Sequence, residues 1–244
     1  MPHLSKKQQA LREIDNRISR LYPFMIKTLR MNYSEFRSLV ALFGDHPIFK
    51  SEGRKPQAPP EVQTNTLAPS MTDGSVSHYT DRSIIAIVSS LRQYITWPCG
   101  AERAALAREL YAQYGISSCV SFIDGTDIVL HQAPSIGRER AHTMHSYKER
   151  YGYKVIAVVD HLKRFRYIWL GFSAACNDQM AQDLSDLHRN SDRFFSSKEY
   201  VLGDAGMKLS DTVLPLFKRE RGRQVTIGPK AYFNYKCAKA RVMV

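Results

Sequence analysis

The chain is poor in cysteine and lacks the long apolar runs of a membrane protein. Its four cysteines are widely scattered and form no C-x-x-C pair, so the sequence suggests neither a disulfide framework nor a zinc knuckle. No apolar run approaches the roughly 18 residues needed to cross a bilayer, and the first residues lack the apolar core of a secretory signal. We therefore expect reduced thiols, no membrane partner and an intracellular location.

Positive charge is abundant and localised. The 244 residues, 43% of them hydrophobic, suffice for one large domain or for one domain with a small extension. The formal net charge is +12, and two segments hold the whole excess. Residues 138–166 carry eight basic and three acidic side chains, and residues 218–241 carry eight and one. This charge favours a polyanion held by its phosphates, and the alternative is a solvated basic face without a partner.

Acidic residues stand where predicted strands end. Residues 121–130 form an apolar, β-branched stretch interrupted by Asp124 and Asp127. Residues 199–206 repeat the arrangement, with an apolar strand leading into Asp204 between glycines. Two carboxylates at neighbouring strand ends can share a hard divalent cation. The alternative for Asp124 is a turn in which its carboxylate hydrogen-bonds the nearby backbone.

The order of the predicted elements indicates an α/β fold with a mixed sheet and flanking helices, preceded by a helical N-terminal region. Strands are predicted at 120–130, 154–160, 166–172 and 199–202. Helices are predicted at 5–20, at 34–43 with Ser34 as cap, around 84–91, at 101–114, at 178–187 and from 232 onward. Because a crossover follows an antiparallel meander, we expect the fourth strand to lie parallel to the first and beside it.

Several motifs follow one another between Thr80 and Val244. They are Y-I-T-W-P at 94–98, I-D-G-T at 123–126, Y-G-Y-K at 151–154 with V-V-D at 158–160, the stretch 171–178, Y-V-L-G-D-A-G at 200–206, and F-N at 233–234 with Arg241. This series resembles the DDE superfamily of Harbinger-type transposases and their domesticated nuclease relatives. The resemblance implies an RNase H-like fold, three catalytic acids, Mg²⁺ or Mn²⁺ as cofactor and DNA as substrate. It also implies a nuclear location and a separate DNA-binding partner protein.

The resemblance assigns roles to individual acids. It implies that Asp124 is the first catalytic acid and Asp204 the second, both as metal ligands. Asp178 also matches a family acid, and it either caps the helix at 178–187 or supports the metal site. The third acid is expected to be a Glu directly after Val244, so the nuclease domain is expected to be C-terminally incomplete. Asp127 follows Asp124 by three residues and is expected on the opposite face of the strand, away from the metal.

Basic and imidazole side chains near the second strand are further candidates. Lys148, Arg150 and Lys154 are candidate nucleic-acid contacts, with a solvated face as the alternative for each. His142 and His145 have no third ligand at a suitable spacing, so the sequence does not favour zinc there.

The sequence thus predicts a four-part chain and two candidate functions. We expect a helical N-terminal region at 1–50, a linker or degraded helix-turn-helix segment at 51–77, a helical connector at 78–118 and an RNase H-like nuclease domain at 119–244. The first function is a metal-dependent DNA endonuclease of transposon origin that hydrolyses phosphodiester bonds. The alternative is a catalytically inactive domesticated relative that acts as a DNA-binding or protein-interaction module.

Overall fold

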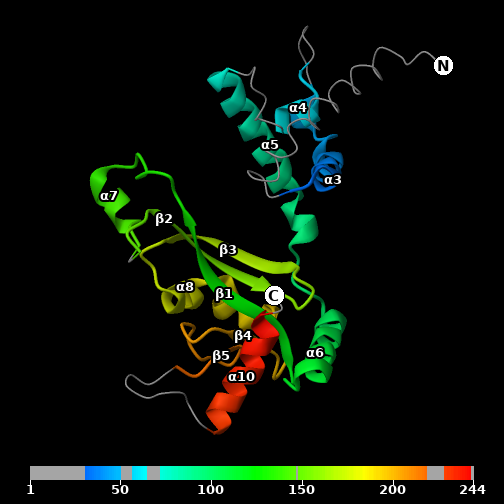
Figure 1. Cartoon of the computed structure of the whole chain (residues 1–244), viewed down its shortest axis with the longest axis vertical. Coiled ribbons are helices and arrows are strands. Elements are labelled where there is room, and N and C mark those ends of the chain that lie inside the picture. Colours follow the sequence, from blue (N-terminus) through cyan, green and yellow to red (C-terminus); the bar gives the residue numbers. More distant parts are fainter. Residues whose placement is uncertain (1–30, 51–56, 65–71, 147, 219–227, 243–244) are drawn as a thin grey trace, which may run out of the picture. The chain divides into compact units, whose positions relative to one another are not determined.

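Figure 1 shows the computed structural model, which describes residues 31–50, 57–64, 72–146, 148–218 and 228–242. The chain divides into two units, Met1–Gln93 and Tyr94–Val244. The helix predicted at 5–20 lies outside the described residues. Within the described ranges, no helix is long and apolar enough to cross a membrane.

The described part of the first unit is built from short helices and the long helix α5 around a small aromatic core. Its elements are α3 (Tyr33–Phe43), η1 (Pro47–Phe49), α4 (Pro60–Thr64) and α5 (Asp73–Tyr94), the last of which ends at the boundary of the two units. The helix predicted at 34–43 is present as α3, and its Phe36, Val40 and Phe43 are buried in a core that α5 completes through Ala86. The cap of α3 is Asn32 rather than Ser34, because the side chains of Asn32 and Glu35 each accept the other's backbone N–H.

Helix α5 begins earlier than its apolar residues suggest. Asp73, its first residue, lies inside the segment 51–77 that was expected to be a linker. The hydroxyl of Thr72 accepts a hydrogen bond from the N–H of Ser75, which is the contact an N-cap makes. A cap of this kind starts a helix on polar residues, before any apolar periodicity is visible.

The second unit contains a five-stranded sheet in the order β3-β2-β1-β4-β5. The strands are β1 (Cys119–Val129), β2 (Gly152–Val159), β3 (Phe165–Ser173), β4 (Tyr200–Gly203) and β5 (Val213–Pro215). Strands β1, β2 and β3 form an antiparallel meander, whereas β4 runs parallel to β1 and β5 runs parallel to β4. The prediction of a mixed α/β sheet is confirmed, including the parallel pairing of the first and fourth strands.

Helices cover both faces of this sheet. They are α6 (Gly100–Tyr114), α7 (Arg138–Thr143), α8 (Asp178–Leu184), α9 (Asp186–Arg189), η2 (Ser191–Arg193) and α10 (Pro229–Val242). Helices α6 and α10 share one core with Phe122 of β1 and Leu202 of β4. On the other face, Ala181 of α8 and Leu187 of α9 pack with Ile123 of β1. The result is an RNase H-like mixed sheet with flanking helices (Figure 1).

Three short elements differ from the sequence prediction. The helix expected at 178–187 is two helices, because Ser185 is fully buried and its extended backbone separates α8 from α9. Strand β5 has only three residues, too few to show an alternating pattern. Helix α7 has six mostly polar residues and one buried position, so it shows no apolar stripe.

Candidate active site

Asp124 lies within β1 on the face that α10 covers. Phe122, two residues earlier and therefore on the same face, belongs to the core shared with α10. The Asp124 side chain is 64% exposed, and its Oδ2 lies 3.4 Å from Nη2 of Arg241 in α10. Its Oδ1 accepts a hydrogen bond of 2.9 Å from the N–H of Gly125. The carboxylate is thus held loosely and remains open to solvent.

Asp204 is brought to Asp124 by the register of two parallel strands. Phe122 of β1 pairs with Leu202 of β4, and each is followed two residues later by an aspartate. The Oδ1 of Asp204 accepts hydrogen bonds from the N–H groups of Gly206 (2.8 Å) and Met207 (3.1 Å). These bonds fix the carboxylate at the end of β4 and leave its Oδ2 without a hydrogen-bond donor among the described residues.

Asp178 approaches the same place from the other side of β1. The N-cap of α8 is Asn177, whose side chain accepts the N–H of Met180 at 2.8 Å, so the interpretation of Asp178 itself as the cap is wrong. Asp178 packs directly against the backbone of Gly125, where a Cβ atom would lie 2.3 Å from its Oδ1. Any larger residue at position 125 would therefore displace Asp178.

Lys154 is buried between two carboxylates. Its Nζ lies 2.7 Å from Oδ1 of Asp127 and 3.1 Å from Oδ1 of Asp178, and its side chain is 6% exposed. Burial alone would lower the pKa of Lys154, but its contacts with Asp127 and Asp178 outweigh burial and raise the pKa above its usual value. This position differs from the prediction that Lys154 contacts DNA phosphates, because the ammonium group faces two carboxylates inside the protein.

The remaining predicted residues are Asp127, which contacts Lys154, and Lys148 and Arg150, which do not. Asp127 is on the α8 face of β1, opposite Asp124, as the strand periodicity indicates. Lys148 and Arg150 are exposed in the segment between α7 and β2. Sequence reasoning missed the pairing of Asp127 with Lys154, because the two residues face each other only in the β1–β2 register.

The neighbouring charges act on the protonation of Asp124. Loss of water around its carboxylate raises the pKa of Asp124, and the negative charges of Asp204 and Asp178 act in the same direction. Arg241 and the Gly125 N–H oppose this change without cancelling it. Asp124 therefore lies within range of two further carboxylates, and Lys154 and Arg241 offset part of their negative charge. The charge that remains is negative, which favours a bound cation.

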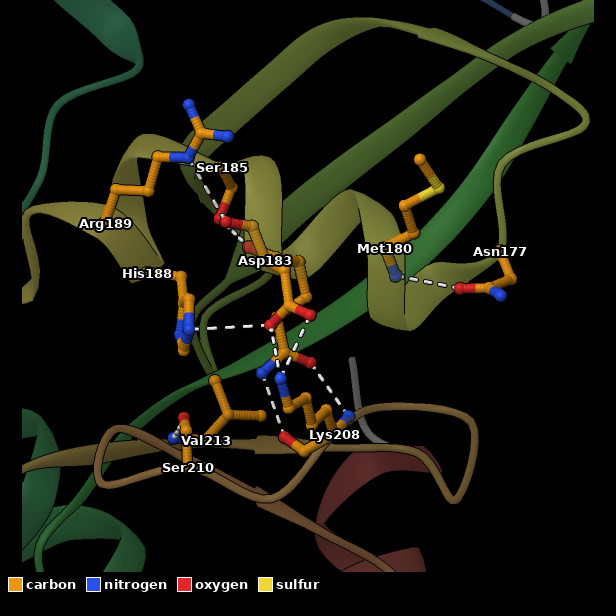
Figure 2. A network of polar contacts seen from close by, with 10 residues as sticks. Asn177, Met180, Asp183, Ser185, His188, Arg189, Lys208, Ser210 and Val213 are labelled. Carbon is orange, nitrogen blue, oxygen red and sulfur yellow. Dashed lines mark hydrogen bonds and ion pairs between the residues drawn. The ribbon is translucent and has the colours of Figure 1, made fainter.

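Figure 2 shows a polar network that ties the loop after β4 to α8. Gln182 is fully buried; its Oε1 accepts the N–H of Lys208 and its Nε2 donates to the Lys208 carbonyl, both at 2.9 Å. The Nζ of Lys208 also lies 3.0 Å from each carboxylate oxygen of Asp183. Since α8 begins with Asp178 and the loop begins with Asp204, the network fixes the two acids relative to each other. No spacing rule predicts these contacts between residues 25 or 26 positions apart.

The donor set suits Mg²⁺ or Mn²⁺, which prefer carboxylate oxygens. Asp204 offers its Oδ2, an oxygen without a donor, and Gly206 leaves the space beside the carboxylate open, because a Cβ there would lie 3.1 Å from Oδ1 and 3.4 Å from Oδ2. Within the part of the chain that the structure describes, no three His, Cys, Asp or Glu side chains are grouped so as to hold a metal ion. Asp124 and Asp204 would thus form an open site that needs water or substrate oxygens as further ligands. The same finding gives His142 and His145 no third ligand among those residues.

Comparison with known proteins places this site in a family. The family model described as DDE superfamily endonuclease matches residues 123–244, half of the chain. The match begins one residue before Asp124 and includes Asp178, Asp204 and α10. Neither a curated protein nor a solved structure matches the chain. The chain therefore belongs to the DDE superfamily endonuclease family.

Proposed function

We propose that this protein is a metal-dependent DNA endonuclease of transposon origin, with Asp124 and Asp204 as the catalytic metal ligands. One observation carries the proposal: in the register of two parallel strands each aspartate follows a paired residue by two positions, and loss of water, together with the charges of Asp204 and Asp178, raises the pKa of Asp124. The family supplies the reaction class, and the motif series favours the Harbinger-type branch within it.

Each residue has a defined task in this proposal. Divalent cations, when bound at such a site, activate water and stabilise the leaving oxygen during phosphodiester hydrolysis. Asp124 binds through a carboxylate that is open to solvent, and Asp204 binds through the oxygen that its turn leaves without a donor. Arg241 holds a guanidinium group beside Asp124, where an approaching phosphate gains a charge-assisted hydrogen bond.

Asp178 is assigned a positioning role rather than a place among the metal ligands. One of its oxygens is paired with the buried Lys154, so Asp178 is held in place as a fixed negative charge behind Gly125. Lys154 in turn balances the charge of both Asp178 and Asp127. The ammonium group thus limits the negative charge of the site to what one or two cations can neutralise.

The wider organisation is part of the same proposal. The nuclease domain at 119–244 acts on DNA that the exposed Lys148 and Arg150 help to hold, and residues 1–118 supply a helical region and a connector. A DNA substrate places the protein in the nucleus, and a separate DNA-binding protein would select the target.

A second candidate is a catalytically inactive relative that binds DNA or protein. It is favoured by one observation: the described residues contain no group of three acids or other ligands around a common point. Such a relative keeps the basic surface and the fold but does not cleave DNA.

Nicking of supercoiled plasmid in the presence of Mn²⁺ separates the two candidates. The endonuclease produces open circles with Mn²⁺ and none with EDTA, and Asp124→Asn abolishes the product. Asp192→Asn is the matched control, because Asp192 is exposed in η2 and has no hydrogen bond or ion pair among the described residues. Nicking that survives in Asp124→Asn would reject the assigned site, and a complete lack of nicking by the unmodified protein would favour the inactive relative.

A further inference from the structure

Helix α10 buries one side and exposes aromatic rings on the other. Cys237 and Ala240 are almost completely buried in the core beneath α6 and the sheet. On the solvent side, Tyr232 is 61% and Tyr235 is 67% exposed. These two tyrosines and the exposed Lys239 follow one another at helical spacing, so they form one stripe. A helix that only covers a core would be expected to carry polar residues along this stripe.

Helix α10 is also strongly cationic. The helix carries Lys230, Lys236, Lys239 and Arg241 and no acidic residue. The Nζ of Lys236 lies 4.8 Å from the ring centroid of Tyr232, so cation and ring form a unit. Arg241, near the last turn, reaches Asp124. Aromatic and positive groups therefore run along the helix and end at the candidate active site.

The start of this helix is fixed to the body of the second unit. Asn234 uses both ends of its side-chain amide, accepting the N–H of Phe217 and donating to its carbonyl, each at 2.9 Å. The ring of Phe233 meets the ring of Phe217 edge-on at 5.4 Å. Among the described residues, Tyr235 has no ring or cation contact of its own. Helix α10 thus holds the Tyr235 ring in a fixed position, where the ring is available to a ligand.

We propose that the surface formed by Tyr232, Tyr235 and Lys239 binds an unpaired DNA strand that leads to the acidic site. This inference rests on the proposed function, in which the strand is cleaved at Asp124 and Asp204. Unpaired bases expose their faces and stack on aromatic rings, while the phosphates between them interact with lysines. Paired bases present no such faces, so the tyrosines distinguish a single strand from a duplex. A protein partner would meet the lysines of α10 and no acidic side chain of that helix, which favours a polyanion as the occupant.

Fluorescence anisotropy with one labelled oligonucleotide, single-stranded or annealed to its complement, tests this surface. EDTA is included, so that binding is measured apart from any metal-dependent cleavage. We expect the double variant Tyr232→Ala/Tyr235→Ala to weaken single-strand binding by about tenfold or more and duplex binding by no more than about twofold. The double Tyr→Phe variant should restore binding, because it keeps both rings.

Two further variants identify the kind of contact. Lys239→Gln should reduce the dependence of single-strand binding on salt by about one phosphate contact, whereas the tyrosine variant should leave this slope unchanged. Phe165→Ala is the control, because it removes a ring that is 50% exposed on the edge strand β3, away from α10. An equal loss for single strand and duplex, or no loss for either, would overturn the proposal. Because these assays contain EDTA, their outcome is independent of the Mn²⁺ nicking test.

Discussion

Asp124 and Asp160 both belong to the region of the central sheet, but their carboxylates differ in burial and in hydrogen bonding. Asp160, directly after β2, is fully buried and accepts hydrogen bonds from the N–H groups of Leu162 and Arg164 and from the guanidinium groups of Arg164 and Arg166. Asp124 is 64% exposed, with one backbone hydrogen bond and one arginine at 3.4 Å. The first carboxylate is fully satisfied within the fold, and the second is available to a ligand.

The pKa of each aspartate reflects this difference. Burial would raise the pKa of Asp160, but its hydrogen bonds with Arg164 and Arg166 lower the pKa below its usual value. For Asp124, loss of water and two neighbouring carboxylates leave the pKa raised. Asp160 thus stabilises the fold and Asp124 destabilises it, and carboxylates with a raised pKa are common at functional sites.

The largest loss of stability is expected for Asp160, whose carboxylate is fully hydrogen-bonded within the fold. Asp160→Ala leaves Arg166, whose side chain is 8% exposed, as a buried charge without its partner. We predict a loss of roughly 3–5 kcal/mol in the free energy of unfolding, measured by urea denaturation. A loss below about 1 kcal/mol would show that the hydrogen bonds around Asp160 do not hold the β2–β3 turn.

A smaller loss of stability is expected when Lys154, which contacts both Asp127 and Asp178, is replaced. Lys154→Met leaves Asp127 and Asp178 without their shared cation, and Asp178 is partly exposed. We predict a loss of about 1–3 kcal/mol in stability and roughly a tenfold reduction in Mn²⁺-dependent nicking. Lys163→Met, at an exposed lysine without a side-chain partner among the described residues, should leave stability nearly unchanged. Full nicking activity in a folded Lys154→Met protein would remove the positioning role assigned to Lys154 and Asp178.

The smallest predicted effect is a gain in stability, on replacement of Asp124. Because the pKa of Asp124 is raised in the folded protein, its negative charge lowers stability above that pKa. This penalty disappears as pH falls through the raised pKa toward the unfolded value of 3.8. Asp124→Asn should therefore stabilise the protein at pH 7, by at most about 0.5 kcal/mol because the side chain is largely exposed. Thermal melts at pH 7 and near pH 4 check this; a gain that is larger at the lower pH would contradict the assigned direction.

Much of the fold could be predicted because its signals are local. The apolar runs of β1, β2 and β4, and the order in which a crossover follows an antiparallel meander, predicted the parallel neighbours β1 and β4, and hence the proximity of Asp124 and Asp204. The buried stripe of α10 could be read from Cys237 and Ala240. These features depend on residue type and spacing along a single segment, which the sequence contains directly.

The parts that were missed depend on contacts between segments. The role of Lys154 follows from a cross-strand register that residue types alone do not specify. Gln182 reads as one more polar helix residue until the Lys208 backbone is placed beside it. Gly125 was the available signal for the position of Asp178. A glycine within a strand indicates that another group approaches its backbone closely, but the sequence does not say which residue does so.

Binding of Mn²⁺ tests the central claim most directly, because it needs neither a DNA target nor turnover. The loss of the free Mn²⁺ signal in electron paramagnetic resonance gives the affinity for the unmodified protein and for Asp124→Asn, Asp204→Asn and the exposed control Asp192→Asn. We predict that the protein binds Mn²⁺, that each of the first two substitutions weakens binding by at least about tenfold, and that the control leaves it unchanged. Equal affinity in the unmodified protein and in Asp124→Asn would contradict the assignment of Asp124 as a metal ligand.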